Sequence, residues 1–295
     1  MRRLSLILTA LLAVPALYAQ DRSGWLDNYE IPANSADRVE AAVPESYGPT
    51  DAIRYSTATE SHKIVVHTYF YRDRVIRNFT LLFDRDRRCA LWVAFAAAGK
   101  GDFEANGVGR KDAWGFDPAL PREWQPNIRS AYAGGKYDRG HQVASNDRQT
   151  ELNENRQTFY FSNMSPQFGA LNRGQWSRLE SKVQACAKKT ADGDTLYVVT
   201  GPFFSDSCAV AYDNDSTLCP VPDGFYKCLM RCSFDSTGRV GSAVGTAFVF
   251  ETNSTNAPPD TTTIDAVEQR TGFDFFHLVP EPFQSEAENM SYRFW

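Results

Sequence analysis

The sequence predicts an α+β fold, and three observations support that class. Strand-like runs rich in β-branched and aromatic residues follow one another between 63 and 96 and recur between 196 and 250. One stretch between these groups, Asn172 to Lys189, carries apolar side chains at helical spacing. Segments with several glycines and prolines separate the elements. Strands and helices that occupy separate stretches of a chain are typical of the α+β class.

The N-terminus has the pattern of a signal peptide. Two arginines at positions 2 and 3 precede an apolar run that ends at Ala19. The run is short for a membrane span, which takes about 20 apolar residues. We therefore expect a signal peptide over 1–19, cleavage before Gln20, and an exported protein that is periplasmic or extracellular, with no stable membrane partner. An N-terminal membrane anchor that persists longer is the alternative.

The remainder divides into a polar arm and one domain. Residues 20–62 have scattered proline and serine and few aliphatic clusters, which predicts an N-terminal arm or leader. From 63 to 295 the chain has a length within the range of a single domain. We expect one domain there, and a homodimer is compatible with the sequence.

The domain begins with an expected antiparallel meander of three strands, Lys63–Tyr71, Arg77–Asp84 and Cys89–Ala96, which charged turns separate. Residues 99–135 have no sustained period and predict a long ordered loop, a kind of segment that is often functional. The later expected elements are a short strand at Thr158–Ser162, the helix Asn172–Lys189, strands at Leu196–Thr200, Phe225–Phe234 and Ser242–Phe250, a loop over Thr252–Thr263, and a short helix at Asp265–Arg270.

The chain contains six cysteines, an even number that favours disulfides in an exported protein. A zinc site is the alternative, but no CxxC pair is present, and three residues separate the nearest couple, Cys228 and Cys232. The six positions are Cys89, Cys186, Cys208, Cys219, Cys228 and Cys232.

The charge balance gives two opposed indications about nucleic acid. The net charge is −5, and loss of the two leader arginines takes it to −7, which is a mild argument against a nucleic-acid partner. Between Arg110 and Lys182, however, eleven basic and eight acidic residues give a local balance of +3. This segment is compatible with a basic cleft, although composition alone favours a solvated surface of mixed charge.

A compact group of functional side chains stands at Asp138-Arg139-Gly140-His141. An imidazole with an ordinary pKa near 6.5 is mostly neutral at neutral pH, so His141 can take a proton from an attacking water. Arg139 can neutralise a phosphate oxygen, and Gly140 allows a close approach of the backbone. A tetrapeptide alone is a weak signal, because a lone histidine is more often structural.

Two further motifs follow in a recognisable order, SNMSPQ at 162–167 and LNRGQWSRLE at 171–180. With DRGH at 138–141, they resemble the DNA/RNA non-specific endonucleases, whose active site has the ββα-metal form. LWVAF at 91–95 and GFDFF at 272–276 extend the resemblance to about residues 64–276. The resemblance implies a central antiparallel β-sheet flanked by helices, with a ββα-metal active site.

The resemblance also implies roles for individual residues. His141 is the expected general base, Asn172 the direct ligand of Mg²⁺, and Glu180 a ligand through water. Mg²⁺ prefers oxygen donors and keeps several waters, which fits one amide oxygen, and Mn²⁺ or another divalent ion is compatible with the same ligands. Arg139 and Arg110 are expected to bind substrate phosphate; Arg110 lies upstream of an FDP step at 116–118.

Other positions are less defined. Asn163 is expected either to hydrogen-bond within the catalytic site or to satisfy the local loop backbone. Gln184 stands where some relatives carry a further arginine, which predicts weaker stabilisation of transition-state charge. Structural roles are expected for His62, His67 and His277.

Together these features predict a secreted, metal-dependent endonuclease that acts on DNA and/or RNA with little sequence specificity. The resemblance implies that it leaves 5′-phosphate ends. The alternative is a catalytically inactive, exported nucleic-acid-binding module of the same fold. The presence of His141, Asn172 and Glu180 favours the enzyme. A zinc hydrolase ranks last, because the histidines are scattered.

Overall fold

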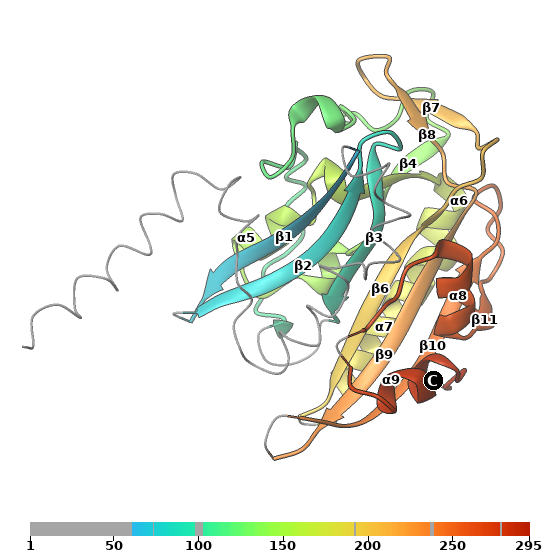
Figure 1. Cartoon of the computed structure of the whole chain (residues 1–295). Helices are drawn as coiled ribbons and strands as arrows, with labels where there is room; N and C mark the ends of the chain where they lie inside the picture. Colours follow the sequence, from blue (N-terminus) through green and yellow to red (C-terminus); the bar gives the residue numbers. More distant parts are fainter. Residues whose placement is uncertain (1–60, 73, 98–102, 192, 237–238, 278) are drawn as a thin grey trace, which may run out of the picture.

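The computed structural model describes residues 61–72, 74–97, 103–191, 193–236, 239–277 and 279–295 (Figure 1). The expected signal peptide at 1–19 and nearly all of the arm at 20–62 lie outside the described residues. Within the described part, no helix has both the length and the apolar character needed to cross a membrane.

A seven-stranded antiparallel sheet forms the centre of the fold (Figure 1). Its order is β1-β2-β3-β6-β9-β10-β11, so the strands cross the sheet in chain order, while the chain leaves this sheet between β3 and β6 and between β6 and β9. The expected meander is confirmed as β1 to β3, and the three later strands are confirmed as β6, β9 and β10. The bounds are β1 His62–Tyr71, β2 Arg74–Asp84, β3 Cys89–Ala96, β6 Thr195–Phe203, β9 Gly224–Phe234, β10 Val240–Phe250 and β11 Asp260–Thr262.

Helices cover both faces of this sheet. On one face, Leu179 and Val183 of α7 (Ser177–Lys189) pack with Val198 and Leu229. On the other face, α8 (Ile264–Thr271) and α9 (Phe283–Glu288) pack against Trp92 and Tyr226, and Figure 1 shows them on the side away from α7. These apolar contacts bury the two cores that hold the layers together.

The segment between β3 and β6 carries a small strand pair outside the central sheet. It contains the two-stranded antiparallel pair of β4 and β5, followed directly by the α6-to-α7 helical segment. The predicted ββα arrangement is therefore present. The bounds in this segment are α5 Leu152–Gln157, β4 Tyr137–His141, β5 Met164–Phe168 and α6 Gly169–Leu171; a second small sheet pairs β7 Val210–Tyr212 with β8 Leu218–Pro220.

The prediction of a strand at Thr158–Ser162 is wrong. A helix, α5, ends just before it, and a 3-10 turn occupies Phe161–Asn163. The helix begins at a capping box in which the side chains of Glu151 and Glu154 each accept main-chain N–H groups. Aromatic content suggested a strand, but Phe159 and Phe161 are buried as anchors of a loop. The true strand, β5, begins two residues later.

The expected helix Asn172–Lys189 is only partly regular. Residues Asn172–Trp176 form a π-turn, and Gly174 has φ −109° and ψ −107°, outside the helical region. A regular helix runs from Ser177 to Lys189. The other expected helix, Asp265–Arg270, is confirmed within α8, and residues 103–135 form the expected long loop.

All six cysteines are free thiols in this structure, so the expected disulfides are not confirmed. Cys228 and Cys232 lie four residues apart on β9 and are fully buried in the core with Tyr197 and Met230. Their packing is that of small apolar side chains.

Candidate active site

Main-chain pairing places the DRGH motif beside Ser165-Pro166-Gln167, the SPQ part of the SNMSPQ motif. In the β4-β5 register, Arg139 lies opposite Pro166, Gly140 opposite Ser165 and His141 opposite Met164. A Cβ atom at Gly140 would lie 2.5 Å from both Cβ and Oε1 of Gln167. The close approach of these two strands therefore requires glycine at 140, which links the two motifs physically.

The kink at Gly174 joins the strand pair to α7. A Cβ atom there would lie 2.2 Å from Oδ1 of Asn256, and the same oxygen accepts a hydrogen bond from the Gln175 N–H at 2.8 Å. The kink takes the Gln175 N–H out of the regular helical hydrogen-bond pattern, and the side-chain amide of Asn256 accepts its hydrogen bond instead. Asn172 precedes this kink, and Glu180 follows it on the regular helix.

The strand pair, the long loop and the helical segment enclose a cavity of about 440 Å³. Five of the six residues predicted for the site line it, and Trp114 and Asp138 join them. The five are Arg110, Arg139, His141, Asn172 and Glu180, and the sixth, Asn163, does not line the cavity. The structure brings together side chains that lie up to 70 positions apart in the chain, from 110 to 180.

His141 has the state required of a proton acceptor. Its imidazole hydrogen-bonds to the main chain of Arg139, while Nε2 is buried without a hydrogen-bond partner, which leaves Nδ1 as the donor. Rings of Trp114 and Phe159 lie with centroids 5.4 Å from the imidazole. Burial, followed by the charges of Arg110 and Arg139, lowers the pKa of His141 to about 3. The ring is therefore neutral, with a lone pair on Nε2.

The amide of Asn172 is fixed by Asp138. Asn172 Nδ2 donates to Asp138 Oδ2 at 3.0 Å, and no described residue donates to its Oδ1, so the oxygen is available to the cavity. Asp138 also accepts hydrogen bonds from Arg173 Nη1 at 2.7 Å. Sequence reasoning did not single out Asp138, although its place within the DRGH motif was the signal that could have identified it.

Glu180, which lines the cavity, lies near a buried lysine. Burial raises the pKa of Glu180, and the charge of Lys227 opposes that rise. Lys227 on β9 is 2% exposed, and its Nζ lies 4.6 Å from the centroid of the Trp176 ring. It also faces the buried carboxylate of Asp147, to which Gln184 hydrogen-bonds. No motif marks Lys227 in the sequence, so its contribution could only be seen in the fold.

The two predicted phosphate-binding arginines both lie near the Trp114 ring. The Arg139 guanidinium is 3.6 Å from the Trp114 ring centroid, and its Nη1 donates to the carbonyl oxygens of Ile128 and Arg129. Arg110 lies 5.7 Å from the same ring and pairs with Asp112 at 2.8 Å. Trp114 was not predicted for the site; it holds the Arg139 head group by cation–π contact.

Asn163 is not brought to the cavity. Its side chain is fully buried, Oδ1 accepts from the Val143 N–H at 3.0 Å, and Nδ2 donates to the carbonyl oxygens of Val143 and Thr158. These contacts match the alternative expectation, that the Asn163 amide satisfies loop backbone, and they leave its side chain outside the cavity lining.

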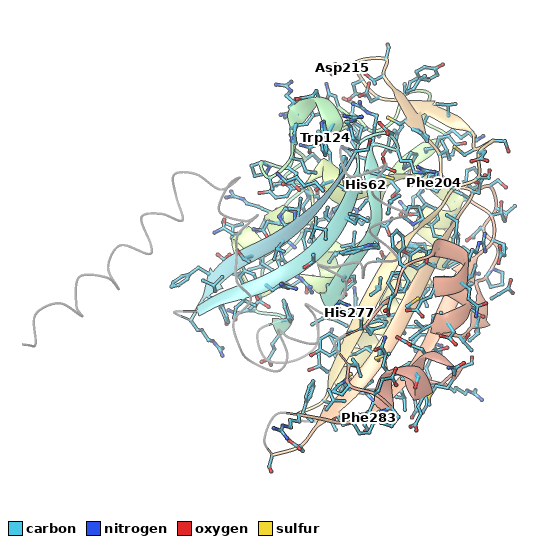
Figure 2. The ribbon with its side chains drawn as sticks, viewed as in Figure 1. His62, Trp124, Phe204, Asp215, His277 and Phe283 are labelled. Atoms are coloured by element: carbon cyan, nitrogen blue, oxygen red, sulfur yellow. The ribbon has the colours of Figure 1, made fainter. Side chains whose placement is uncertain are left out.

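The other described histidines lie away from the cavity, His62 and His67 on β1 and His277 in the C-terminal segment. His67 is buried with Nε2 2.9 Å from Asp117 Oδ2, and Ser162 Oγ donates to the same carboxylate, so this group ties β1 to the loop and to the SNMSPQ motif. His62 on β1 and His277 in the C-terminal segment lie apart in Figure 2. Structural roles fit these positions, and the described histidines form no zinc site.

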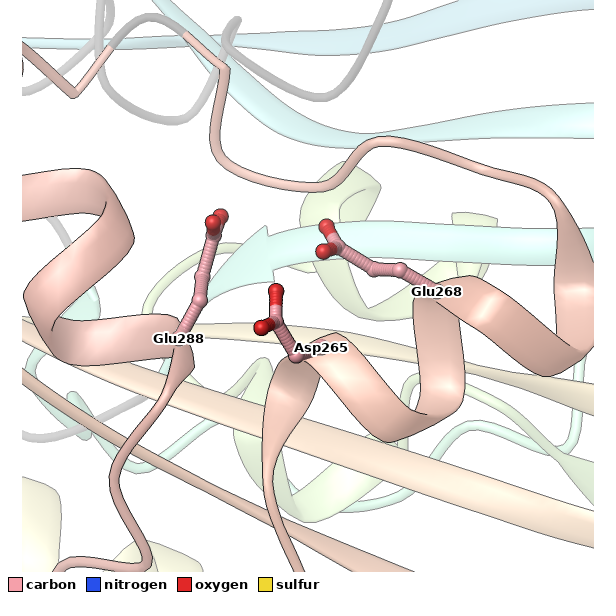
Figure 3. A group of neighbouring side chains, drawn as sticks. All are labelled: Asp265, Glu268 and Glu288. Atoms are coloured by element: carbon pink, nitrogen blue, oxygen red, sulfur yellow. The ribbon is translucent and has the colours of Figure 1, made fainter.

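One acidic cluster lies on the opposite face of the sheet. Asp265 and Glu268 of α8 and Glu288 of α9 point toward one another, with oxygens within 4.8 Å (Figure 3). Burial raises the pKa of Glu268 to about 8, and burial together with the charge of Glu268 raises that of Glu288 to about 9. These groups are separated from His141 by the sheet and do not contribute to the cavity.

The cavity offers the donors that a hard divalent cation requires. The amide oxygen of Asn172 and the carboxylate of Glu180 are oxygen ligands, which Mg²⁺ prefers, and few protein ligands suffice when waters complete the shell. Arginines and a neutral histidine stand around the same space, an arrangement suited to a phosphate ester and an attacking water.

Comparisons with known proteins agree with this geometry. The DNA/RNA non-specific endonuclease family model matches residues 60–282. A nuclease of Nostoc sp. is 29% identical over 227 residues, which cover 73% of this chain and 77% of that protein. Nuclease C1 of Cunninghamella echinulata is 30% identical over 207 residues, 67% of this chain and 81% of that protein.

A solved structure shows the same fold. A chain in the crystal structure of the EndoG/EndoGI complex superposes with a TM-score of 0.52 at 23% identity, over 74% of this chain and 88% of that chain. The family match extends over both strands of the ββ pair and the helical segment that lines the cavity. The chain therefore belongs to the DNA/RNA non-specific endonuclease family.

Proposed function

We propose that this nuclease hydrolyses phosphodiester bonds in DNA, RNA or both, with little sequence specificity and with a divalent cation, Mg²⁺ in the first place. The observation that carries the proposal is the unpaired Nε2 of His141 in a cavity that also presents Oδ1 of Asn172. A neutral acceptor and an oxygen ligand beside arginines suit hydrolysis of a phosphate ester better than binding alone.

In the proposed reaction, His141 Nε2 takes a proton from water as the water oxygen attacks phosphorus. The P–O bond to the 3′ oxygen then breaks, solvent protonates that oxygen, and the imidazolium returns its proton to solvent. The products are a 5′-phosphate and a 3′-hydroxyl. The hydrogen bond from His141 to the main chain of Arg139 keeps the ring oriented with Nε2 as the acceptor.

The other cavity residues bind the phosphate and would hold the cation. Arg139 and Arg110 neutralise phosphate oxygens, because both guanidinium groups line the cavity. Asn172 and Glu180 would hold the cation, Glu180 through water, and the cation would supply Lewis-acid stabilisation of charge developing on the phosphate. Contacts of this kind read phosphate and not base edges, which accounts for low sequence specificity.

The test is cleavage of supercoiled plasmid and single-stranded RNA by purified residues 20–295, with Mg²⁺ or with EDTA, beside His141→Ala. Cation-dependent cutting that is lost in the variant supports the proposal, and the two substrates define the sugar preference. If folded wild-type protein binds nucleic acid but cuts neither substrate, the inactive binding module replaces the enzyme.

We also propose export to the periplasm or the extracellular space, on the basis of the signal-peptide pattern at 1–19. N-terminal sequencing of the protein recovered from cell fractions tests this: a start at Gln20 in an exported fraction supports it, and an intact Met1 in the cytosol contradicts it. Counting free thiols in the denatured, exported protein tests whether any of the six cysteines pair.

A further inference from the structure

We infer that a second cavity, on the neighbouring face of α7, is a subsite for the nucleic-acid strand that continues beyond the bond being cut. This inference rests on the proposed nuclease function. The cavity has a volume of about 370 Å³ and lies between α7, β10 and the loop that leads into β11. Its main lining residues are Arg178, Lys182, Phe248, Pro258, Pro259 and Trp295.

The position of this cavity relative to the catalytic one follows from the helix. Ser177 and Glu180 of α7 line the catalytic cavity, whereas Arg178 and Lys182 line the second. The two cavities therefore lie on adjoining faces of one helix, whose diameter with side chains is about 10–12 Å. A strand that advances roughly 3.4 Å per nucleotide, as each strand of duplex DNA does, crosses that width in about three nucleotides. One substrate strand can occupy both cavities.

The charges of the two cavities differ in a way that favours phosphate in the second. In the catalytic cavity, Arg110 pairs with Asp112 and Arg173 pairs with Asp138. Arg178 and Lys182 are exposed, make no ion pair with any described residue, and share the second cavity with no aspartate or glutamate. In a chain of net charge −5, these two side chains are a local concentration of positive charge.

The second cavity also carries an ordered aromatic side chain. The Trp295 indole is 38% exposed and stacks on Phe248, with ring centroids 5.2 Å apart and planes 11° apart. Lys182 Nζ lies 5.4 Å from the indole centroid, and Arg293 Nε donates to the main-chain oxygen of Trp295 at 3.0 Å. Cations beside a fixed, partly exposed aromatic ring match the phosphates and bases of a single strand.

The test compares short and long substrates in the full chain. We expect the double variant Arg178→Ala, Lys182→Ala to raise KM several-fold for a single strand of about 20 nucleotides, with kcat unchanged, and to leave cleavage of an oligonucleotide of about four nucleotides unaffected. The slope of log affinity against log salt should become shallower by about 1.4, the value for two phosphate contacts on a single strand. Trp295→Ala should raise KM for the long substrate without changing the salt slope.

The matched control is Lys188→Ala, Lys189→Ala, which removes two exposed cations from the same helix outside the cavity. Equal losses for short and long substrates, or equal effects of the control and test variants, would overturn the subsite. An acidic peptide such as polyglutamate that competes as strongly as the single strand would assign the cavity to a protein partner and also overturn it.

Binding separates this inference from the proposed function. Fluorescence anisotropy of a labelled single strand is measured on His141→Ala with and without the Arg178→Ala, Lys182→Ala pair. If wild-type protein fails to cut, the catalytic proposal fails, but a loss of binding in the double variant still supports the subsite. Unchanged binding overturns it whether or not the wild type cuts.

Discussion

Asp138 Oδ2 accepts a hydrogen bond from Asn172 Nδ2 at 3.0 Å, so the first residue of the DRGH motif fixes the amide of the proposed cation ligand. The two residues come from different parts of the ββα unit, β4 and the π-turn before α7. A carboxylate can only accept from the NH₂ side of an amide, and this contact therefore turns the amide oxygen toward the cavity. Asp138 acts on the site through Asn172.

Replacing Asp138 with alanine should weaken binding of the activating cation. Without the carboxylate the amide can rotate, and loss of a residue that orients a ligand costs about 10- to 100-fold in metal affinity. The measurement is plasmid cleavage as a function of Mg²⁺ concentration, which should shift to higher values with little change in the maximal rate.

Arg173→Ala is the matched control, because it removes the other partner of Asp138 and leaves the Asn172 contact in place. A Mg²⁺ dependence in Asp138→Ala that matches wild type would show that the Asp138 contact does not orient the ligand.

His141 should remain a proton acceptor at mildly acid pH. Burial and the charges of Arg110 and Arg139 lower the pKa of His141 to about 3, so the acceptor form persists well below the ordinary pKa of about 6.5. Protonation of His141 should therefore not limit kcat/KM, which reports the free enzyme, until the pH is well below 6.5.

Arg110→Ala provides the internal comparison for this pH profile. Removal of one lowering charge should raise the pKa of His141 and move the acid limb upward, whereas Arg122→Ala, outside the cavity, should leave it in place. An Arg110→Ala profile that coincides with wild type would contradict the electrostatic explanation.

The elements that the sequence predicted well are those with a strong local period. Alternation or continuous apolar runs identified β1 to β3, and helical spacing of Trp176, Leu179 and Val183 identified the helix. The motif order identified the cavity because DRGH and SPQ pair as strands, and Gly140 against Gln167 makes their pairing specific.

The features that were missed depend on long-range contacts. Asn163 resembles a site residue by its motif, but hydrogen bonds to Val143 and Thr158 use its amide in the loop. Lys227 is a strand residue with no local signal, and only the packing of β9 under α7 brings it to Glu180. Trp114 lies in a long loop whose path cannot be deduced from periodicity.

Lys227→Met should both destabilise the fold and alter the pH profile. The lysine faces Glu180 and Asp147, and removal of one partner from a buried charge group costs about 3–5 kcal/mol. Its loss should also raise the pKa of Glu180 further, so that the carboxylate forms at higher pH and cleavage near neutral pH falls.

Lys227→Arg keeps the charge and should retain more of both properties. Urea unfolding gives the stability, and the pH dependence of cleavage gives the effect on the site. A stability loss in Lys227→Met with a wild-type pH profile would restrict Lys227 to a structural role.

Glu288→Gln should stabilise the protein at alkaline pH. Burial and the charge of Glu268 raise the pKa of Glu288 to about 9 in the folded state, above its ordinary value of 4.5. The folded state therefore holds this proton more tightly, and the stability it contributes is complete below pH 4.5 and is lost as pH rises toward 9.

Glutamine is neutral at every pH and keeps an oxygen for the hydrogen bond from Gln284. The variant should exceed wild type by about 2–4 °C in Tm at pH 8, the shift that about 1 kcal/mol produces in a chain of this size, and the two should converge near pH 5. Glu286→Gln, on the same helix and outside the acidic cluster, is the control and should follow wild type. If the Tm of Glu288→Gln and of wild type depended on pH in the same way, folding would not tighten proton binding by Glu288. Other groups would then cause the loss of stability at alkaline pH.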